Sequence, residues 1–303
     1  MTLLTSEDAV RDETKDDGAH DWLFAPAPAG SPTDIAKLGR ERPKFLRVWT
    51  TAMTASGLLA PPPLLVLGGS GGAGVTATAQ GLASVIATDE QLDVDSVVVD
   101  ATPAGGSDLV ARVADEERPM STLQTWLTSD DPSLPSTVEA ACGRASSGAL
   151  VLPRDDRPLP RRETMVSVHR HLSDAGVVPV YDGGAPVSAR GVRPLLADSR
   201  ISLALVVAAR PDAANRLKPV LSWLDDEFGE FLIGDTVIVV CRQSPRDNAD
   251  VAGHLRRNLD GWVRSVVEIP YDPHLAIGER ILWSEVRDET REAYRNVLRE
   301  LTS

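Results

Sequence analysis

The chain has 303 residues, of which 42% are hydrophobic and 25% charged, and its formal net charge at pH 7 is −13. This length and composition predict a globular protein with a full core, and the acidic balance disfavours general nucleic-acid binding, which needs a basic face. No apolar run approaches the length of a membrane span, so we expect a cytoplasmic protein without direct membrane insertion.

The N-terminal part differs in composition from the rest of the chain. Residues 1–40 are rich in Asp, Glu, Ala, Pro and Gly, and such a segment buries too little apolar surface to offset chain entropy. We therefore predict a disordered acidic, Pro/Ala-rich arm over 1–40. Residues 41–61 include the apolar run 45–59, which we expect to dock on the folded domain or on a partner chain. The folded domain itself is expected over residues 62–303.

From Leu64 onward, short apolar runs alternate with amphipathic stretches of helical period. The apolar runs are continuous, which is typical of parallel strands covered on both faces. The sequence therefore predicts an α/β domain with a doubly wound, mostly parallel sheet and helices on both faces. We expect strands at residues 64–68, 96–100, 149–153, 177–181, 202–208, 235–241 and 264–269, and helices between them, such as 211–228 and 246–259.

The first predicted strand runs into a glycine loop, residues 68–74, and then into a predicted helix. Such a loop holds phosphates on backbone amides and on the N-terminus of the helix. A working phosphate loop places a lysine immediately before its Ser or Thr, but here Val75 precedes Thr76. The loop therefore has the form of a phosphate site without its main counter-charge. The alternative is a tight turn with no ligand.

Two later strand ends carry an aspartate. Asp100 closes the second predicted strand, and Asp182 lies at a later strand end, directly before Gly183 and Gly184. A hydroxyl at a helix N-terminus and carboxylates on neighbouring strands are groups that hold Mg²⁺ beside a nucleotide phosphate. We therefore predict a metal site formed by Thr76, Asp100 and Asp182. A helix cap at Asp100 and a plain turn after Asp182 are the alternatives.

In this order the motifs resemble the MinD/ParA group of deviant P-loop ATPases. The resemblance is closer to its degenerate actinobacterial branch, linked to septum-site determination and type VII secretion. The family loop reads Lys-Gly-Gly-x-Gly-Lys-Thr-Thr, whereas residues 70–77 read SGGAGVTA and lack both lysines. Asp100 matches the first acid of the family's Asp-x-Asp element, and Thr102 replaces the second, which usually helps to activate water. Asp182 matches the switch aspartate.

The resemblance continues on the side where the family binds the base. Cys241 falls where the family often has the asparagine that reads adenine, and residues 268–276 are similar to the base-side loop. The resemblance thus implies a nucleotide site made of Ser70, Gly71, Gly72, Ala73, Gly74, Val75, Thr76, Ala77, Asp100, Asp182, Gly183, Gly184, Cys241, Pro270 and Asp272, with Thr76, Asp100 and Asp182 on the metal side.

The function implied by the resemblance is that of a pseudo-ATPase. We expect weak binding of ATP or ADP with Mg²⁺, little or no hydrolysis and no catalytic residue. The role would be that of a regulator or assembly partner in cell division or type VII secretion. The family dimerises face to face, with its signature lysine reaching into the partner's site, which Ser70 cannot do. The expected partner is a second copy or an active paralogue, and no nucleic acid.

Two other functions stay open. Residues 69–74 also satisfy G-x-G-x-x-G after a strand, which would make the chain an NAD(P)-binding oxidoreductase with Asp100 on the ribose hydroxyls. The spacing to Asp100 is somewhat long, and the sequence has no Tyr-x-x-x-Lys pair. The other alternative is an interaction scaffold that binds no nucleotide, because each missing lysine forfeits a charge-assisted hydrogen bond to phosphate.

The remaining cysteines, histidines and arginines do not indicate a catalytic or metal site. The two cysteines lie far apart and indicate neither a disulfide framework nor a metal cluster. His169 and His171 lie on a predicted helix, and we expect both to be solvated. Arg157, with the arginines at 161 and 162, is a candidate for a local basic patch.

Overall fold

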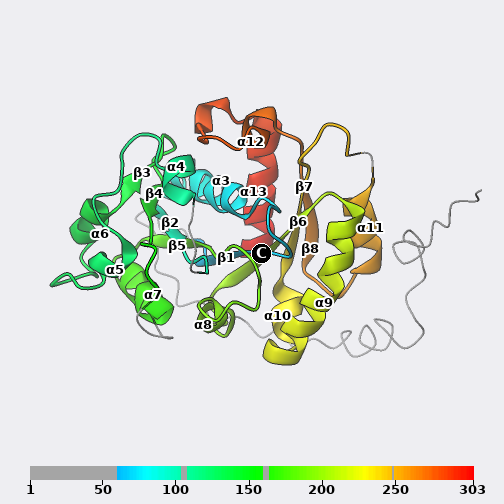
Figure 1. The fold of residues 1–303 in the computed structure, drawn as a ribbon, viewed down its shortest axis with the longest axis horizontal. Helices are drawn as coiled ribbons and strands as arrows, with labels where there is room; N and C mark the ends of the chain where they lie inside the picture. The colour runs from blue at the N-terminus through cyan, green and yellow to red at the C-terminus, as the bar shows by residue number, and fades with distance from the viewer. Residues whose placement is uncertain (1–59, 104–107, 160–163, 248) are drawn as a thin grey trace, which may run out of the picture.

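The structure is a computed structural model of the chain, and it describes residues 60–103, 108–159, 164–247 and 249–303. An eight-stranded sheet forms its centre, with strand order β3-β4-β2-β5-β1-β6-β7-β8 (Figure 1). The edge strand β3 runs antiparallel to β4, and all the other neighbouring pairs in this sheet are parallel. The strands are β1 (Leu64–Gly68), β2 (Ser96–Asp100), β3 (Gly143–Arg144), β4 (Leu150–Leu152), β5 (Val178–Asp182), β6 (Ser202–Ala208), β7 (Val237–Cys241) and β8 (Ser265–Ile269).

Helices cover both faces of this sheet (Figure 1). One face packs against α3 (Val75–Thr88), α4 (Leu109–Val113) and α13 (Asp288–Thr302). The other face packs against α5 (Leu123–Trp126), α6 (Pro135–Ala141), α7 (Thr164–Asp174), α8 (Arg193–Leu196), α9 (Pro211–Phe228) and α11 (Val251–Asn258). The short helices α10 (Glu230–Asp235), α12 (Pro273–Ala276) and η2 (Trp283–Glu285) complete the described chain.

Alternate residues of the central strand enter the two cores. Leu64 and Val66 belong to the core beneath α3 and α13, whereas Leu65 and Leu67 belong to the opposite core. All five residues of β1 are buried, and the same holds for β2 and β5. A strand buried on both faces needs apolar side chains at successive positions, which explains the continuous apolar runs. The predicted doubly wound sheet is confirmed.

A close contact holds the C-terminal helix α13 against α3. The ring of Tyr294, from α13, lies against Gly81 of α3, where an added Cβ would stand 2.4 Å from Tyr294 Cε2. Tyr294 is fully buried. Glycine at position 81 therefore lets α13 approach α3, the helix that starts at the glycine loop.

Two local predictions differ from the structure. The helix predicted at 246–259 begins only at Val251, because the Asp250 carboxylate caps it by accepting a 2.8 Å hydrogen bond from the Gly253 amide. The prediction that His169 is solvated is wrong. This side chain is 4% exposed, and its Nδ1 lies 3.1 Å from the Tyr181 hydroxyl, because α7 packs on β5. Burial lowers the pKa of His169 below its usual value.

The N-terminal predictions lie almost entirely outside the described residues. Residues 1–40 are outside, and of the segment 41–61 only Ala60 and Pro61 are described. The described chain begins beside a groove of about 430 Å³ between α3 and α13. Its lining consists of Ala60, Pro61, Pro62, Val85, Asp89, Leu92, Arg295, Leu298, Arg299 and Thr302.

A truncation pair tests whether residues 45–59 belong to the folded unit. A chain that starts at Leu64 is expected to melt at a lower temperature, or to be less soluble, than one that starts at Glu41. The physical reason is that burial of each large apolar side chain in 45–59 contributes about 1.5–3 kcal/mol. Thermal unfolding of both chains measures the difference. Equal melting temperatures and equal solubility would rule out docking of this segment.

Candidate functional site

The carboxyl ends of three adjacent strands meet at one edge of the sheet. Strand β5 lies between β1 and β2, and Asp182 at its end is in register with Asp100 of β2. Main-chain hydrogen bonds join the segments that follow these strands. The Gly183 amide donates to Val66 O at 2.9 Å, and the Gly68 amide donates to Gly184 O at 2.8 Å. The fold thus brings the glycine loop and both aspartates together, as their order in the sequence predicts.

Thr76 and Asp182 are in direct contact. The Thr76 hydroxyl, in the first turn of α3, donates a 2.6 Å hydrogen bond to Asp182 Oδ2, and the Gly184 amide donates to Oδ1 at 3.2 Å. Asp100 uses its Oδ1 to accept from the amide and hydroxyl of Thr102, at 3.0 and 2.6 Å. Its Oδ2 is buried and has no hydrogen-bond partner among the described residues. Both aspartates are 1% exposed.

The two carboxylates are electrostatically unfavourable without a cation. Burial raises the pKa of Asp182 to about 6, and the negative charge of Asp100 adds to this effect. The hydrogen bonds from Thr76 and Gly184 and the positive charge of Arg112 act in the opposite direction but do not outweigh burial. A divalent cation beside both acids would offset the desolvation of their charged forms.

The donor set suits Mg²⁺. It consists of two carboxylates and a hydroxyl, and it includes the unpartnered oxygen of Asp100. Within the described ranges, no group of three or more His, Cys, Asp or Glu side chains forms a metal cluster. Mg²⁺ is usually held by one or two carboxylates together with waters and substrate phosphates rather than by an all-protein cage. The residues present therefore fit a magnesium ion that accompanies a phosphate ligand.

The glycine loop leaves the N-terminus of α3 open. Gly72 and Gly74 have φ values of 71° and 102°, in the left-handed region that favours glycine. Gly74 occupies the N-cap position, so no side chain caps the first-turn amides, and no acidic residue lies in that turn. Gly71 and Gly72 are exposed, whereas Ala73 is buried beneath them. These amides are available to bind an anion.

A nearly buried valine takes the place of the lysine before Thr76. Val75 is 8% exposed, and its Cγ2 would stand 2.8 Å from a Cβ added to Gly68. The loop is instead braced from the segment after β7, where the Gln243 side-chain amide donates to the Gly72 carbonyl. No motif indicates this contact, because Gln243 follows the predicted strand at a position that matches no family element.

The predicted base-side residues lie across the loop from the aspartates, beyond β6. Cys241, at the end of β7, is 8% exposed, and its Sγ lies 3.7 Å from Thr78 Oγ1. Burial raises the pKa of the Cys241 thiol to about 11. Asp272 caps α12 by accepting from the His274 amide at 2.9 Å. Pro270 lies between β8 and this cap and is partly exposed. A phosphate on the loop would thus lie between the metal side and these residues.

The strand order disfavours a dinucleotide-binding site. In that fold the second strand lies directly beside the first, so its terminal acid reaches the ribose next to the glycine loop. Here β5 separates β1 from β2, and Asp100 is buried and bonded to Thr102. The G-x-G-x-x-G match at residues 69–74 therefore lacks the acid placement that NAD binding needs.

Arg154 is a further polar residue at this edge, and sequence analysis missed it. It follows β4, and its guanidinium donates to the carbonyl of Thr102. Its only sequence signal is its position after the predicted strand at 149–153.

No helix in the described part of the chain is long and apolar enough to cross a membrane.

Comparisons with known proteins give a consistent result for the fold. The sequence matches no protein-family profile and no curated protein. Among solved structures, a ParA-family ATPase from Chlorobium tepidum is similar, with a TM-score of 0.57 and 16% identity over 79% of this chain and 98% of the other. The cell-division ATPase MinD from Pyrococcus furiosus has a TM-score of 0.56 and 18% identity over 80% and 98%.

A third similar structure is the MinC:MinD cell-division complex of Aquifex aeolicus, with a TM-score of 0.53 and 17% identity over 78% of this chain and 95% of the matched one. The identities are low, so the likeness concerns the backbone architecture rather than the chemistry of the site. The described chain has the fold of the MinD/ParA-type P-loop ATPases.

Proposed function

We propose that this protein is a MinD/ParA-like pseudo-ATPase that binds ATP or ADP with Mg²⁺ weakly and acts as a regulator or assembly partner. One observation carries the proposal. Thr76 and Asp182 are joined by a 2.6 Å hydrogen bond next to the buried Asp100, at the mouth of a glycine loop whose lysine position holds Val75. In this proposal the metal side of a nucleotide site is retained, whereas Val75 replaces the phosphate-clamping lysine.

Each group in the site has a defined task in this proposal. The backbone amides from Gly72 to Thr76 bind phosphate oxygens at the N-terminus of α3. Thr76, Asp100 and Asp182 hold Mg²⁺, directly or through water, and the ion when bound offsets the phosphate charge. Thr102 stands where the family places its second acid, and its hydroxyl is already bonded to Asp100. Because residue 102 is a threonine, this position offers no carboxylate to orient a water for attack on the terminal phosphate.

Hydrolysis is therefore expected to stay at background. The purified full chain with Mg²⁺ and ATP should release phosphate no faster than the Asp182→Ala variant, because neither Val75 nor Thr102 supplies the missing charge or base. A coupled phosphate-release assay measures both proteins under the same conditions. Steady release by the natural chain that Asp182→Ala abolishes would contradict the pseudo-ATPase proposal.

Ligand titration separates the proposed function from its two alternatives. Calorimetry with ATP, ADP and NADH, each with Mg²⁺, should give heat for the adenine nucleotides and none for NADH. Binding of NADH alone would support an oxidoreductase. An absence of heat with all three ligands would favour the nucleotide-free scaffold.

The proposed partner is a protein, and the proposed compartment is the cytoplasm. The similar MinD structure from Aquifex aeolicus was solved in complex with MinC, which supports assembly with a partner on this fold. Ser70 replaces the lysine that the family extends into a second subunit. We propose a homodimer that forms without this lysine, or a heterodimer with an active paralogue that supplies it, serving septum positioning or type VII secretion. Sedimentation of the full chain with and without Mg-ATP tests the homodimer directly.

A further inference from the structure

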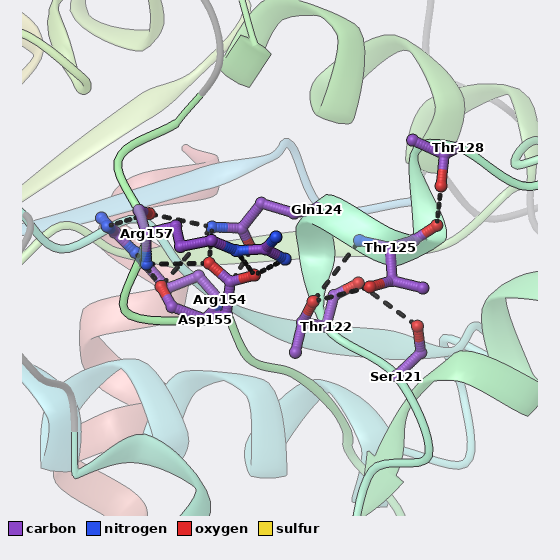
Figure 2. A network of polar contacts seen from close by, with 8 residues as sticks. All are labelled: Ser121, Thr122, Gln124, Thr125, Thr128, Arg154, Asp155 and Arg157. Atoms are coloured by element: carbon purple, nitrogen blue, oxygen red, sulfur yellow. Dashed lines mark hydrogen bonds and ion pairs between the residues drawn. The ribbon is translucent and has the colours of Figure 1, made fainter.

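A guanidinium lies beside the metal side of the site, one strand beyond Asp100. Arg154 follows β4, the neighbour of β2. Its Nε donates to Asp155 O at 3.3 Å, and one terminal nitrogen donates to Arg157 O at 3.2 Å (Figure 2). The other terminal nitrogen donates to Thr102 O. All three acceptors are neutral main-chain carbonyls. A guanidinium has five N–H bonds, so one on each terminal nitrogen is left over after these contacts.

Within the described chain the Arg154 guanidinium forms no direct ion pair, although its charge is among those that lower the pKa of the neighbouring Asp155. The adjacent carboxylate, Asp155, is held by the Arg157 guanidinium at 2.5 Å and by the Gln124 amide at 2.8 Å (Figure 2). Among the described residues, no ion pair joins Arg154 to a carboxylate. The side chain is half-buried, where a charge is less screened than at the surface.

Successive contacts connect this charge to the glycine loop. Arg154 binds the carbonyl of Thr102, and an added Cβ on Gly184 would stand 3.2 Å from Thr102 Cγ2. The Gly184 carbonyl in turn accepts from the amide of Gly68, at the start of the loop. Arg154 therefore lies on the β5–β2 side of the loop, with the aspartates, and away from Cys241 on the β7 side. In the proposed nucleotide site the terminal phosphate lies on this side, with the metal ligands, and the base lies on the side of Cys241.

We propose that Arg154 recognises the terminal phosphate of a nucleoside triphosphate and so replaces, from within the same chain, part of the charge that the loop has lost. The proposal rests on the proposed nucleotide site. Two N–H bonds on adjacent terminal nitrogens match two oxygens of a phosphate. Because a diphosphate lacks the terminal group, Arg154 sets a preference for triphosphate over diphosphate.

The test compares ATP and ADP affinities of the full chain in Mg²⁺ by calorimetry. Arg154→Gln should weaken ATP binding at least about tenfold and change ADP binding less than about twofold. The matched control is Arg299→Gln in α13, since Arg299 is 67% exposed, pairs with Glu292 and lies toward the end of α13 that contacts the start of β6, at the opposite edge of the sheet. This control should leave the ratio of the affinities for ATP and ADP unchanged.

The outcomes distinguish this proposal from the proposed function. Equal weakening of both nucleotides by Arg154→Gln, or no change in either, would mean that Arg154 only holds its own loop, and would overturn the proposal. Absence of nucleotide binding by the natural chain would overturn the proposed function and this inference together. If Arg154→Gln lowers the melting temperature, Arg154→Lys tests the role of the charge instead. This variant keeps the positive charge and should give a ratio of ATP to ADP affinities between those of the natural chain and the glutamine variant. A lysine variant as unselective as the glutamine variant would overturn the role of charge.

Discussion

Asp182→Asn is expected to stabilise the protein at pH 8 by up to about 3 kcal/mol. The pKa of Asp182 is about 6 in the folded state against an ordinary value of 3.8, and each pH unit of difference corresponds to about 1.4 kcal/mol. Because the folded pKa is raised, the stability linked to protonated Asp182 is fully present below pH 3.8 and is lost as pH rises through 6. Asparagine carries no charge, so this pH-dependent loss of folding free energy disappears. Its amide oxygen can accept from the Gly184 amide, and its NH2 group can donate to the Thr76 hydroxyl.

Thermal unfolding at pH 8 and pH 5 measures this effect. For a domain of this size, 1 kcal/mol shifts the melting temperature by roughly 2–4 °C, and the gain should shrink at pH 5. Mg²⁺ should stabilise the natural chain at pH 8 more than the variant, which has lost a metal ligand. Asp198→Asn is the control, since Arg200 lowers the pKa of that carboxyl and its loss should not stabilise. A variant less stable than the natural chain at pH 8 would refute the account of Asp182.

Val75→Lys is expected to strengthen binding of Mg-ATP roughly 10- to 100-fold. Val75 occupies the first position of α3, next to Thr76 and to the uncapped amides of the loop. A charge-assisted hydrogen bond to phosphate contributes about 1.5–3 kcal/mol. The valine side chain is nearly buried against Gly68, but the long stem of lysine can carry its ammonium group out to the phosphates. Calorimetry of both proteins with Mg-ATP measures the change.

Val75→Met serves as the matched control, because methionine provides a long unbranched side chain without the charge. It should leave the affinity for Mg-ATP close to that of the natural chain. If the lysine variant stays folded and binds no better than the methionine variant, the glycine loop is only a turn between β1 and α3.

Much of the fold could be predicted from local patterns. The strands at 64–68, 96–100 and 202–208 match the structure at both ends, because each contains a continuous apolar run of strand length. The two-residue strand β3 was not predicted, since so short an edge strand has no periodicity. The burial of His169 depends on the packing of α7 against Tyr181 in β5, which no local pattern contains.

The candidate site was predictable only in part, for a physical reason. Residues at strand ends, such as Asp100 and Asp182, could be assigned to one edge because parallel strands share their carboxyl ends. The contact between Arg154 and Thr102 joins positions 52 residues apart in sequence. It depends on β4 pairing with β2, which the alternation of strands and helices does not determine. The roles of all these residues in binding stay predictions.

We propose above all that Thr76, Asp100 and Asp182 form a working metal–nucleotide site although the loop has lost its lysines. The most direct measurement is calorimetric titration of the full chain with ATP, once in Mg²⁺ and once in EDTA. The account predicts weak but measurable binding in Mg²⁺ that EDTA abolishes, because the metal must offset two buried carboxylates and the phosphates. Binding of equal strength in EDTA, or no binding in either condition, would contradict it.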